Sequence, residues 1–362
     1  MPKRRNSSLE LLRLLAMLAI VFHHAIVHNG DGLDMIDSVP SRVFLEFAGI
    51  LVGKTAVCLF FIISIWFLAD RQLTFRGSCR RVWILEREIL FYSVLCYLVC
   101  APMLGTFSPT TFAARLFPVI TGEWWFVSDY VLLILALPFL VTVLKALPAH
   151  EHGVLAIFLA VFFGFVQYLP YVGWALKDSS DIMGLLALAT LTCYIRWYAC
   201  RTQRPSSCVL LVAGALSLAL LILLYVLRMD VRIAGRLWTP MQDWHSLPVI
   251  VLSFVIFLGV NRLTPHHWPI IDRMASGTFA IYLITDTPEA EFLLWTKLFP
   301  LHRIADTPMP IAIITLISIG LYTACIGIDL IRQTLFRATI DRNPGAWFDI
   351  IAPQSFERHG AS

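Results

Sequence analysis

Residues Val209–Leu227 read VLLVAGALSLALLILLYVL, and no charged side chain interrupts them. An apolar run of about 20 residues is long enough to cross the hydrocarbon core of a bilayer as an α-helix. Two further runs, Val131–Leu144 and Ile311–Ile328, have the same character. A transmembrane β-barrel would instead show segments of about ten residues in which polar and apolar side chains alternate. These runs therefore predict an all-α protein that crosses a membrane several times.

The composition of the whole chain supports this class. Of its 362 residues, 58% are hydrophobic and 14% are charged, and the mean hydropathy is +0.76. Soluble domains contain about 25% charged residues, so a water-soluble enzyme is excluded. A net charge of +4 provides no basic face, so we expect no nucleic-acid partner. The 8 cysteines include no CxxC pair and no zinc-type spacing with histidine, so we expect neither a disulfide framework nor a metal.

Apolar windows along the chain predict ten membrane-spanning helices. They cover residues 9–28, 44–69, 82–104, 124–147, 153–171, 182–199, 207–227, 246–261, 275–298 and 309–331. The helix ends on the side of the N-terminus carry about twice as many lysines and arginines as the opposite ends, which predicts that both chain termini are cytoplasmic. We expect one transmembrane domain, residues 1–337, and a short cytosolic tail, residues 338–362.

Ionisable side chains give the first predicted helix a polar stripe. It carries Glu10, Arg13, His24 and His28, and a charge near the bilayer centre costs at least about 2.5–3.5 kcal/mol. Arg13 and His24 differ by about 20° around the helix axis and by ~16 Å along it. Arg13 either extends to the headgroups while His24 hydrogen-bonds a neighbouring helix, or the pair binds an anion and transfers a proton. His23 lies about 100° from the stripe, and we expect it to pack against a neighbour.

Polar residues in other helices predict a cavity at mid-depth. Lys54 lies near the middle of the second predicted helix, and Asp286 lies about as deep in the ninth, where Pro288 interrupts the apolar run. Lys54 can be neutralised either by Asp286 or by Asp129. Trp125 falls at the predicted outer interface, where it belongs to an aromatic belt or lines the cavity.

A group of arginines precedes and enters the third predicted helix. Arg80, Arg81 and Arg87 belong to it. They either anchor the helix at the inner membrane face or bind phosphate groups, for which the bidentate guanidinium is suited.

Several of these segments resemble one known family. SLELLRLLAMLAIVFHH (Ser8–His24) is similar to the opening of the bacterial membrane acyltransferase-3 family, with its arginine, ten residues and a histidine, here Arg13 and His24. GKTAVCLFFIISIWFL (Gly53–Leu68) resembles the second span of that family. Further similar pieces are EREILFYSVL (Glu86–Leu95), EWWFVSDYVLLILALPFL (Glu123–Leu140), CYIRWY (Cys193–Tyr198) and FAIYLI (Phe279–Ile284). The chain departs from the family pattern at Cys58, Ile65 and Thr285, where aspartate, glycine and histidine are usual.

The resemblance implies an enzyme of the bacterial cytoplasmic membrane. Such an enzyme moves an acyl group, often acetyl, from cytosolic acyl-CoA to a hydroxyl of a surface or lipid-linked glycan. It implies acetyl-CoA as co-substrate and no bound cofactor. His24 would then be the base or the acyl carrier, and Arg13 would bind the donor. Arg80, Arg81 and Arg87 are expected to help bind the donor, and the cavity is expected to contain Glu10, Lys54, Ser64, Trp125, Asp129 and Asp286.

Two other classes of polytopic protein stay open at this point. A transporter or flippase for a glycan or an amphiphile also combines many spans with an interrupted helix and charges inside the membrane. A glycan polymerase or ligase is the third class, although the predicted outer segments 105–123 and 228–245 are short for it. The acyl group, the acceptor and the oligomeric state are not determined by the sequence.

Overall fold

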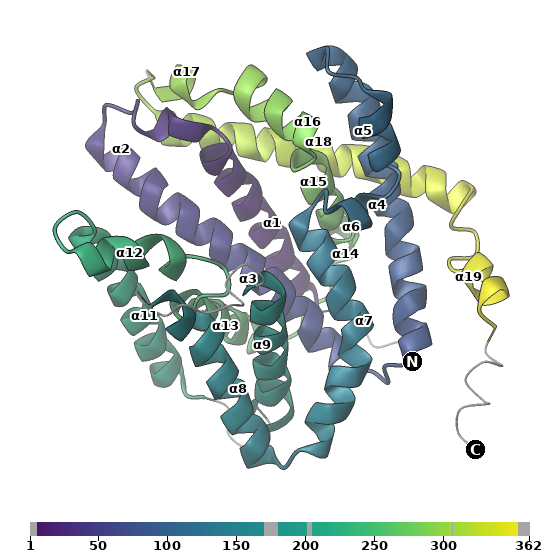
Figure 1. Cartoon of the computed structure of the whole chain (residues 1–362), viewed down its shortest axis with the longest axis horizontal. Helices are drawn as coiled ribbons and strands as arrows, with labels where there is room; N and C mark the ends of the chain where they lie inside the picture. The colour runs from purple at the N-terminus through teal and green to yellow at the C-terminus, as the bar shows by residue number, and fades with distance from the viewer. Residues whose placement is uncertain (1–5, 170–179, 201–204, 306, 354–362) are drawn as a thin grey trace.

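The computed structural model describes residues 6–169, 180–200, 205–305 and 307–353, and every element among them is helical (Figure 1). Each of the ten predicted spans coincides with one helix or with two or three consecutive helical elements. These are α1 (Ser7–Val27), α2–η2–α3 (Val39–Val43, Phe44–Gly49 and Ile50–Leu68), α4 (Phe75–Leu104), α7 (Trp125–Ala146), α8 (Ala149–Gly164), α9–η5 (Ser180–Tyr194 and Ile195–Ala199), α11 (Ser207–Leu227), α13 (Leu247–Asn261), α15–α16–η6 (Thr278–Thr285, Pro288–Glu291 and Phe292–Leu298) and α18 (Pro310–Ala338).

Short helices connect these long elements. They are η1 (Gly30–Leu33), α5 (Pro109–Ala114), α6 (Pro118–Thr121), η3 (Val166–Tyr168), α12 (Arg232–Met241), α14 (Pro269–Ala275), α17 (Leu301–Ala305) and α19 (Ala346–Ile351). Within the described ranges, 7 helices are long and apolar enough to cross a membrane, so the chain is an all-α polytopic membrane protein. The other three predicted spans are the charged α4, the short α13 and the broken α15–α16–η6. The number of crossings and their orientation stay predictions.

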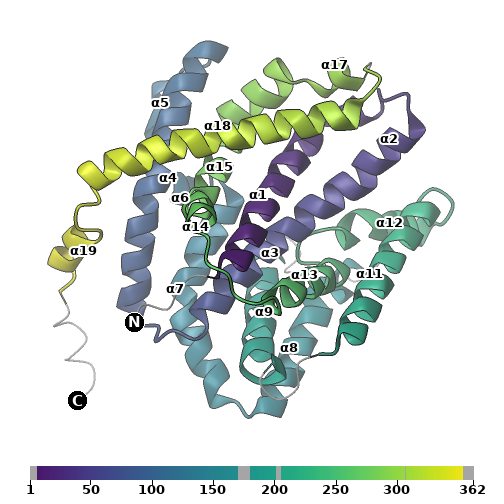
Figure 2. The same ribbon diagram turned by 180° about the vertical axis from the view of Figure 1, so that it is seen from behind.

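Helix α1 lies in the middle of the molecule and packs along α3, and it also contacts α13, α14, α15 and α18 (Figures 1 and 2). Two glycines four residues apart on the η2–α3 helix, Gly49 and Gly53, allow this close approach. A Cβ atom at Gly53 would lie 2.2 Å from the Cβ atom of His23, and one at Gly49 would lie 2.2 Å from Ile26. His23 therefore packs against α3.

The predicted interruption near Pro288 is present. Helix α15 ends at Thr285, Asp286 caps it, and Pro288 starts α16. Proline cannot donate a backbone hydrogen bond, so the α15 helix does not continue through it. The break places the carboxylate of Asp286 beside α1 instead of within a regular helix.

The two ends of α1 lie in different surroundings. Its first turns, the end of α3, η5 and the end of α13 surround one cavity. The opposite end of α1 is close to η1 and to α17. Just after this end, Asn29 accepts a hydrogen bond from the backbone N–H of Leu301 in α17 at 2.8 Å.

Candidate active site

The first part of the site is a cavity of 670 Å³ at the N-terminal end of α1, which we call the arginine cavity. Its polar lining consists of Asn6, Glu10, Arg13, Asp70, Arg71, Arg196 and Asn261. Arg13 forms an ion pair with Glu10 at 2.7 Å and lies over the ring of Phe60, with its Cζ 5.8 Å from the ring centre. Arg196 pairs with Asp70 and lies over Trp66. Three guanidinium groups thus line one hollow with only two carboxylates, which suits an anionic ligand.

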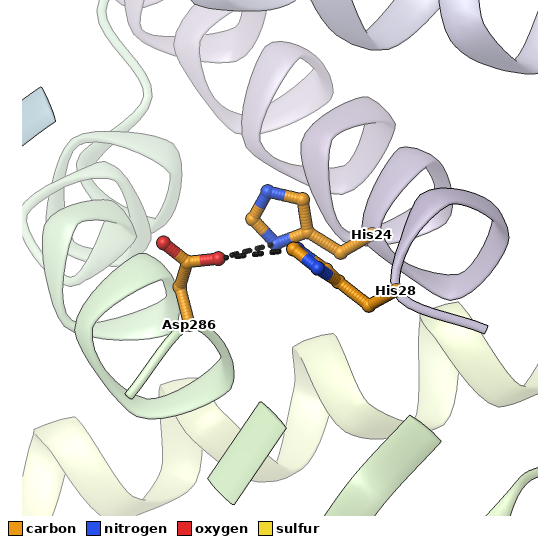
Figure 3. A group of neighbouring side chains, drawn as sticks. All are labelled: His24, His28 and Asp286. Carbon is orange, nitrogen blue, oxygen red and sulfur yellow. Dashed lines mark ion pairs between the residues drawn. The ribbon is translucent and has the colours of Figure 1, made fainter. Parts of the chain in front are cut away.

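The second part lies near the other end of α1, where His24 and His28 turn toward Asp286 (Figure 3). Nδ1 of His24 is 3.5 Å from Oδ1 of Asp286, and Nε2 of His28 is 3.4 Å from the same oxygen. Nδ1 of His28 is 2.9 Å from Oε1 of Glu291. His24 is buried. We call these four residues the histidine cluster.

The histidine cluster was only partly predictable. His24 and Asp286 were predicted site residues, and the structure brings them together. His28 was predicted on the polar stripe of α1 but not as a site residue, and Glu291 was not a predicted site residue. The signal for His28 is its spacing: four residues after His24, it lies on the same face of the helix. Nothing local connects Glu291 to α1, because the contact depends on the break before α16.

Aromatic rings occupy the space between the arginine cavity and the histidine cluster. The ring of Tyr282 is 6.1 Å from that of His24 and 5.4 Å from that of Phe126. Phe126 in turn contacts Phe60, with 6.0 Å between the ring centres, and Phe60 lies under Arg13. A wall of aromatic side chains therefore joins the two parts of the site. Tyr282 belongs to the FAIYLI segment, but its place beside His24 depends on how α15 packs.

Lys54 has a partner that neither predicted pairing included. Its Nζ is 3.0 Å from Oδ1 of Asp243, so it is paired neither with Asp286 nor with Asp129. Burial alone would raise the pKa of Asp243, but the charges of Lys54 and His245 outweigh it, and the net pKa is lowered. The physical reason for the unexpected pairing is that the chain after α12 turns back into the bundle.

The buried residue Trp244 shows this inward turn. Its ring stacks on Trp125, with ring centres 6.0 Å apart, and it also contacts Phe61 at 5.1 Å. Trp125 thus packs against a buried residue of the bundle and is itself partly exposed. Ser64 donates its hydroxyl hydrogen to the carbonyl oxygen of Phe60 at 2.9 Å, a bond within its own helix.

None of the three predicted donor-binding arginines lines the arginine cavity. Arg80 pairs with Asp349 at 3.1 Å and donates to the carbonyl oxygen of Pro344. Arg87 pairs with Asp341 at 2.5 Å. Both therefore hold the C-terminal segment against α4. Arg81 lies close enough to Arg71, a cavity residue, for their charges to interact.

The comparisons with known proteins give one match. A family model described as an acyltransferase domain, of the acyltransferase-3 type, matches residues 6–329. No curated protein and no solved structure matches the chain. The matched range includes both the arginine cavity and the histidine cluster.

Proposed function

This chain belongs to the acyltransferase-3 family and is a membrane acyltransferase, and on that premise we propose that it acylates a hydroxyl group of a surface or lipid-linked glycan. The proposed donor is acyl-CoA, with acetyl as the acyl group, and the proposed location is the bacterial cytoplasmic membrane. The observation that supports this best is the arrangement on α1: Arg13 lines the arginine cavity, and His24, farther along the helix, faces the carboxylate of Asp286.

The arginine cavity is the proposed donor site. Coenzyme A carries several phosphate groups, and arginine recognises phosphate through charge-assisted bidentate hydrogen bonds. Arg13, Arg71 and Arg196 line the cavity together. With the predicted orientation, the cavity opens toward the cytoplasm, where acyl-CoA is made. The thioester end of the donor would extend along the aromatic wall toward His24.

His24 is the proposed general base. Its Nδ1 faces Asp286, and its Nε2 points away from that carboxylate (Figure 3). With its proton on Nδ1, the nitrogen on the side of Asp286, His24 keeps a lone pair on Nε2. Nε2 then takes the proton of the acceptor hydroxyl while the hydroxyl oxygen bonds to the thioester carbonyl carbon. The carbon–sulfur bond breaks, and the thiolate of coenzyme A receives the proton from His24.

The test is release of free thiol from acetyl-CoA by the purified protein in the presence of a glycan acceptor. We expect His24→Ala to lower the rate about 10²–10⁴-fold, the usual effect of losing a general base. His23→Ala is the matched control, because His23 is the adjacent buried imidazole and packs against Gly53. Full turnover by His24→Ala would contradict the mechanism, and so would loss of turnover in His23→Ala alone.

A further inference from the structure

Three metal-ligand atoms converge in the histidine cluster. Nδ1 of His24, Nε2 of His28 and a carboxylate oxygen of Asp286 all lie within 4.8 Å of one another. The two imidazoles come from successive turns of α1, and the carboxylate comes from the break after α15. The proposed acyl transfer uses only two of these residues and gives His28 no task.

The two nitrogen–oxygen distances in this group are longer than those of charged hydrogen bonds and close to those between two ligands of one metal ion. A hydrogen bond from an imidazole to a carboxylate is about 2.7–2.9 Å long, whereas the two nitrogens lie 3.5 and 3.4 Å from Oδ1 of Asp286. Both nitrogens are buried and have no hydrogen-bond partner. Ligands that are each about 2.0–2.1 Å from a tetrahedral Zn²⁺ lie about 3.3 Å from one another. The observed spacing therefore leaves room for an ion between the three atoms.

Glu291 lies on the far side of the His28 ring from Asp286. Its Oε1 lies 2.9 Å from Nδ1 of His28. A metal ion on Nε2 of His28 would leave the ring proton on Nδ1, the nitrogen that faces Glu291. A carboxylate that accepts from the far nitrogen of a histidine is also the usual outer partner of a metal-bound imidazole.

We propose that His24, His28 and Asp286 bind a divalent transition-metal ion of the Zn²⁺ type. Two imidazoles and one carboxylate select such an ion over Mg²⁺ or Ca²⁺, which prefer oxygen ligands. The ion enters from the side of His28 and Glu291, whose side chains are 24% and 33% exposed. Three protein ligands leave the fourth position for water or for a hydroxyl group.

The bound ion blocks the base that acyl transfer needs, and this consequence, unlike the site itself, rests on the proposed function. A metal on Nδ1 of His24 uses the lone pair of that nitrogen, so the ring proton resides on Nε2. Nε2 then has no lone pair with which to accept the proton of the acceptor. Zn²⁺ therefore inhibits turnover.

Binding is tested directly with chelator-treated, purified full-length protein in detergent and with Co²⁺ as the probe. We expect a single tightly held Co²⁺ ion per chain, the intense visible absorption of four-coordinate cobalt, and loss of that absorption when Zn²⁺ is added. His28→Gln should abolish the absorption, and Glu291→Gln should weaken Co²⁺ binding about 10–100-fold, as for other outer partners. His23→Gln is the matched control and should bind Co²⁺ like the unaltered protein.

Two outcomes would overturn the site. One is a Co²⁺ spectrum with only the weak bands of the hydrated ion. The arrangement of the cluster would then be explained by a protonated His28 between Asp286 and Glu291, without a metal ion. The other is unchanged Co²⁺ binding in His28→Gln. The thiol-release assay separates the two proposals: Co²⁺ binding without any inhibition by Zn²⁺ would support the site and contradict His24 as the base. If Co²⁺ does not bind and His24→Ala is strongly impaired, the result would contradict the metal site and support His24 as the base.

Discussion

At the scale of single residues, the arginines near the N-terminal helix ends lie in two different surroundings. Arg13 faces a hollow whose other cations are Arg71 and Arg196. Arg80 is occupied by Asp349 and by a backbone carbonyl. Both types of arginine look alike in the sequence, since each lies near a helix end on the predicted cytoplasmic side. Their surroundings differ: Arg13 pairs with Glu10 of its own helix and lines the arginine cavity, whereas the partner of Arg80 comes from the C-terminal segment.

This difference predicts the effect of replacing each arginine. Arg13→Ala should weaken acyl-CoA binding about 10–100-fold, because a hydrogen bond to a charged group contributes about 1.5–3 kcal/mol. Arg13→Lys should restore only part of the affinity, because lysine cannot make a bidentate contact. Isothermal titration of the detergent-purified protein with acyl-CoA measures the affinity. Arg80→Ala is the control and should bind acyl-CoA normally; equal losses in Arg13→Ala and Arg80→Ala would remove the distinction.

The Lys54–Asp243 pair gives a second prediction at this scale. Lys54→Met leaves an uncompensated carboxylate, and Asp243→Asn leaves an uncompensated ammonium group. Each should cost about 1–3 kcal/mol of stability, less than in a fully buried pair because both side chains are about one-third exposed. The double variant should be more stable than either single variant. The measurement is a double-mutant cycle of thermal unfolding in detergent.

The pH dependence of this pair follows from the lowered pKa of Asp243. A carboxyl group whose pKa is lower in the folded than in the unfolded protein stabilises the fold above its unfolded pKa, and the effect is lost as the pH falls through the folded value. The coupling between Lys54 and Asp243 should therefore stay constant across the neutral range and decline only in acid. A coupling that disappears between neutral and mildly acidic pH would contradict the pairing.

At the scale of helices, the local sequence patterns predicted where the helices lie in the chain better than they predicted the contacts between distant segments. The apolar runs located all ten helical segments, and the sequence Thr285-Asp286-Thr287-Pro288 located the break, because proline and apolar periodicity act within one helix. The inward turn of Trp244, the partner of Lys54 and the contact of Glu291 with His28 were not predictable. Each of them joins segments far apart in the chain, and no periodicity within one segment encodes such a contact.

The α1–α3 contact allows a test of how helix packing positions His24. Gly53→Ala should destabilise the protein by about 1–3 kcal/mol, as overpacking usually does, because the new Cβ would lie 2.2 Å from His23. It should also lower turnover, since His24 is adjacent to the residue that must move. The measurements are the apparent unfolding temperature and thiol release. Gly320→Ala in α18 is the control, with nothing within 4 Å of the added atom, and an equal effect there would contradict the role of Gly53.

At the scale of the whole molecule, the arrangement of the helices makes the side of the membrane decisive for the function. The loop between α7 and α8 lies at the same end as η5, because Lys145 lies over the ring of Trp197 and His152 contacts the same ring. Arg196 of η5 lines the arginine cavity. A cytosolic acyl-CoA can enter that cavity only if this end of the bundle faces the cytoplasm.

Single cysteines in a cysteine-free background test this orientation. His150 and Asn343 are exposed positions predicted to be cytoplasmic, whereas Ser38 and Thr110 are exposed positions predicted to face the other side. A maleimide that cannot cross the membrane should label cysteine at Ser38 and Thr110 in intact cells. It should label cysteine at His150 and Asn343 only after the cells are permeabilised, which also shows that all four positions react. The opposite pattern would place the arginine cavity outside the cytoplasm, where acyl-CoA is absent, and would contradict the proposed donor even if His24 proved essential.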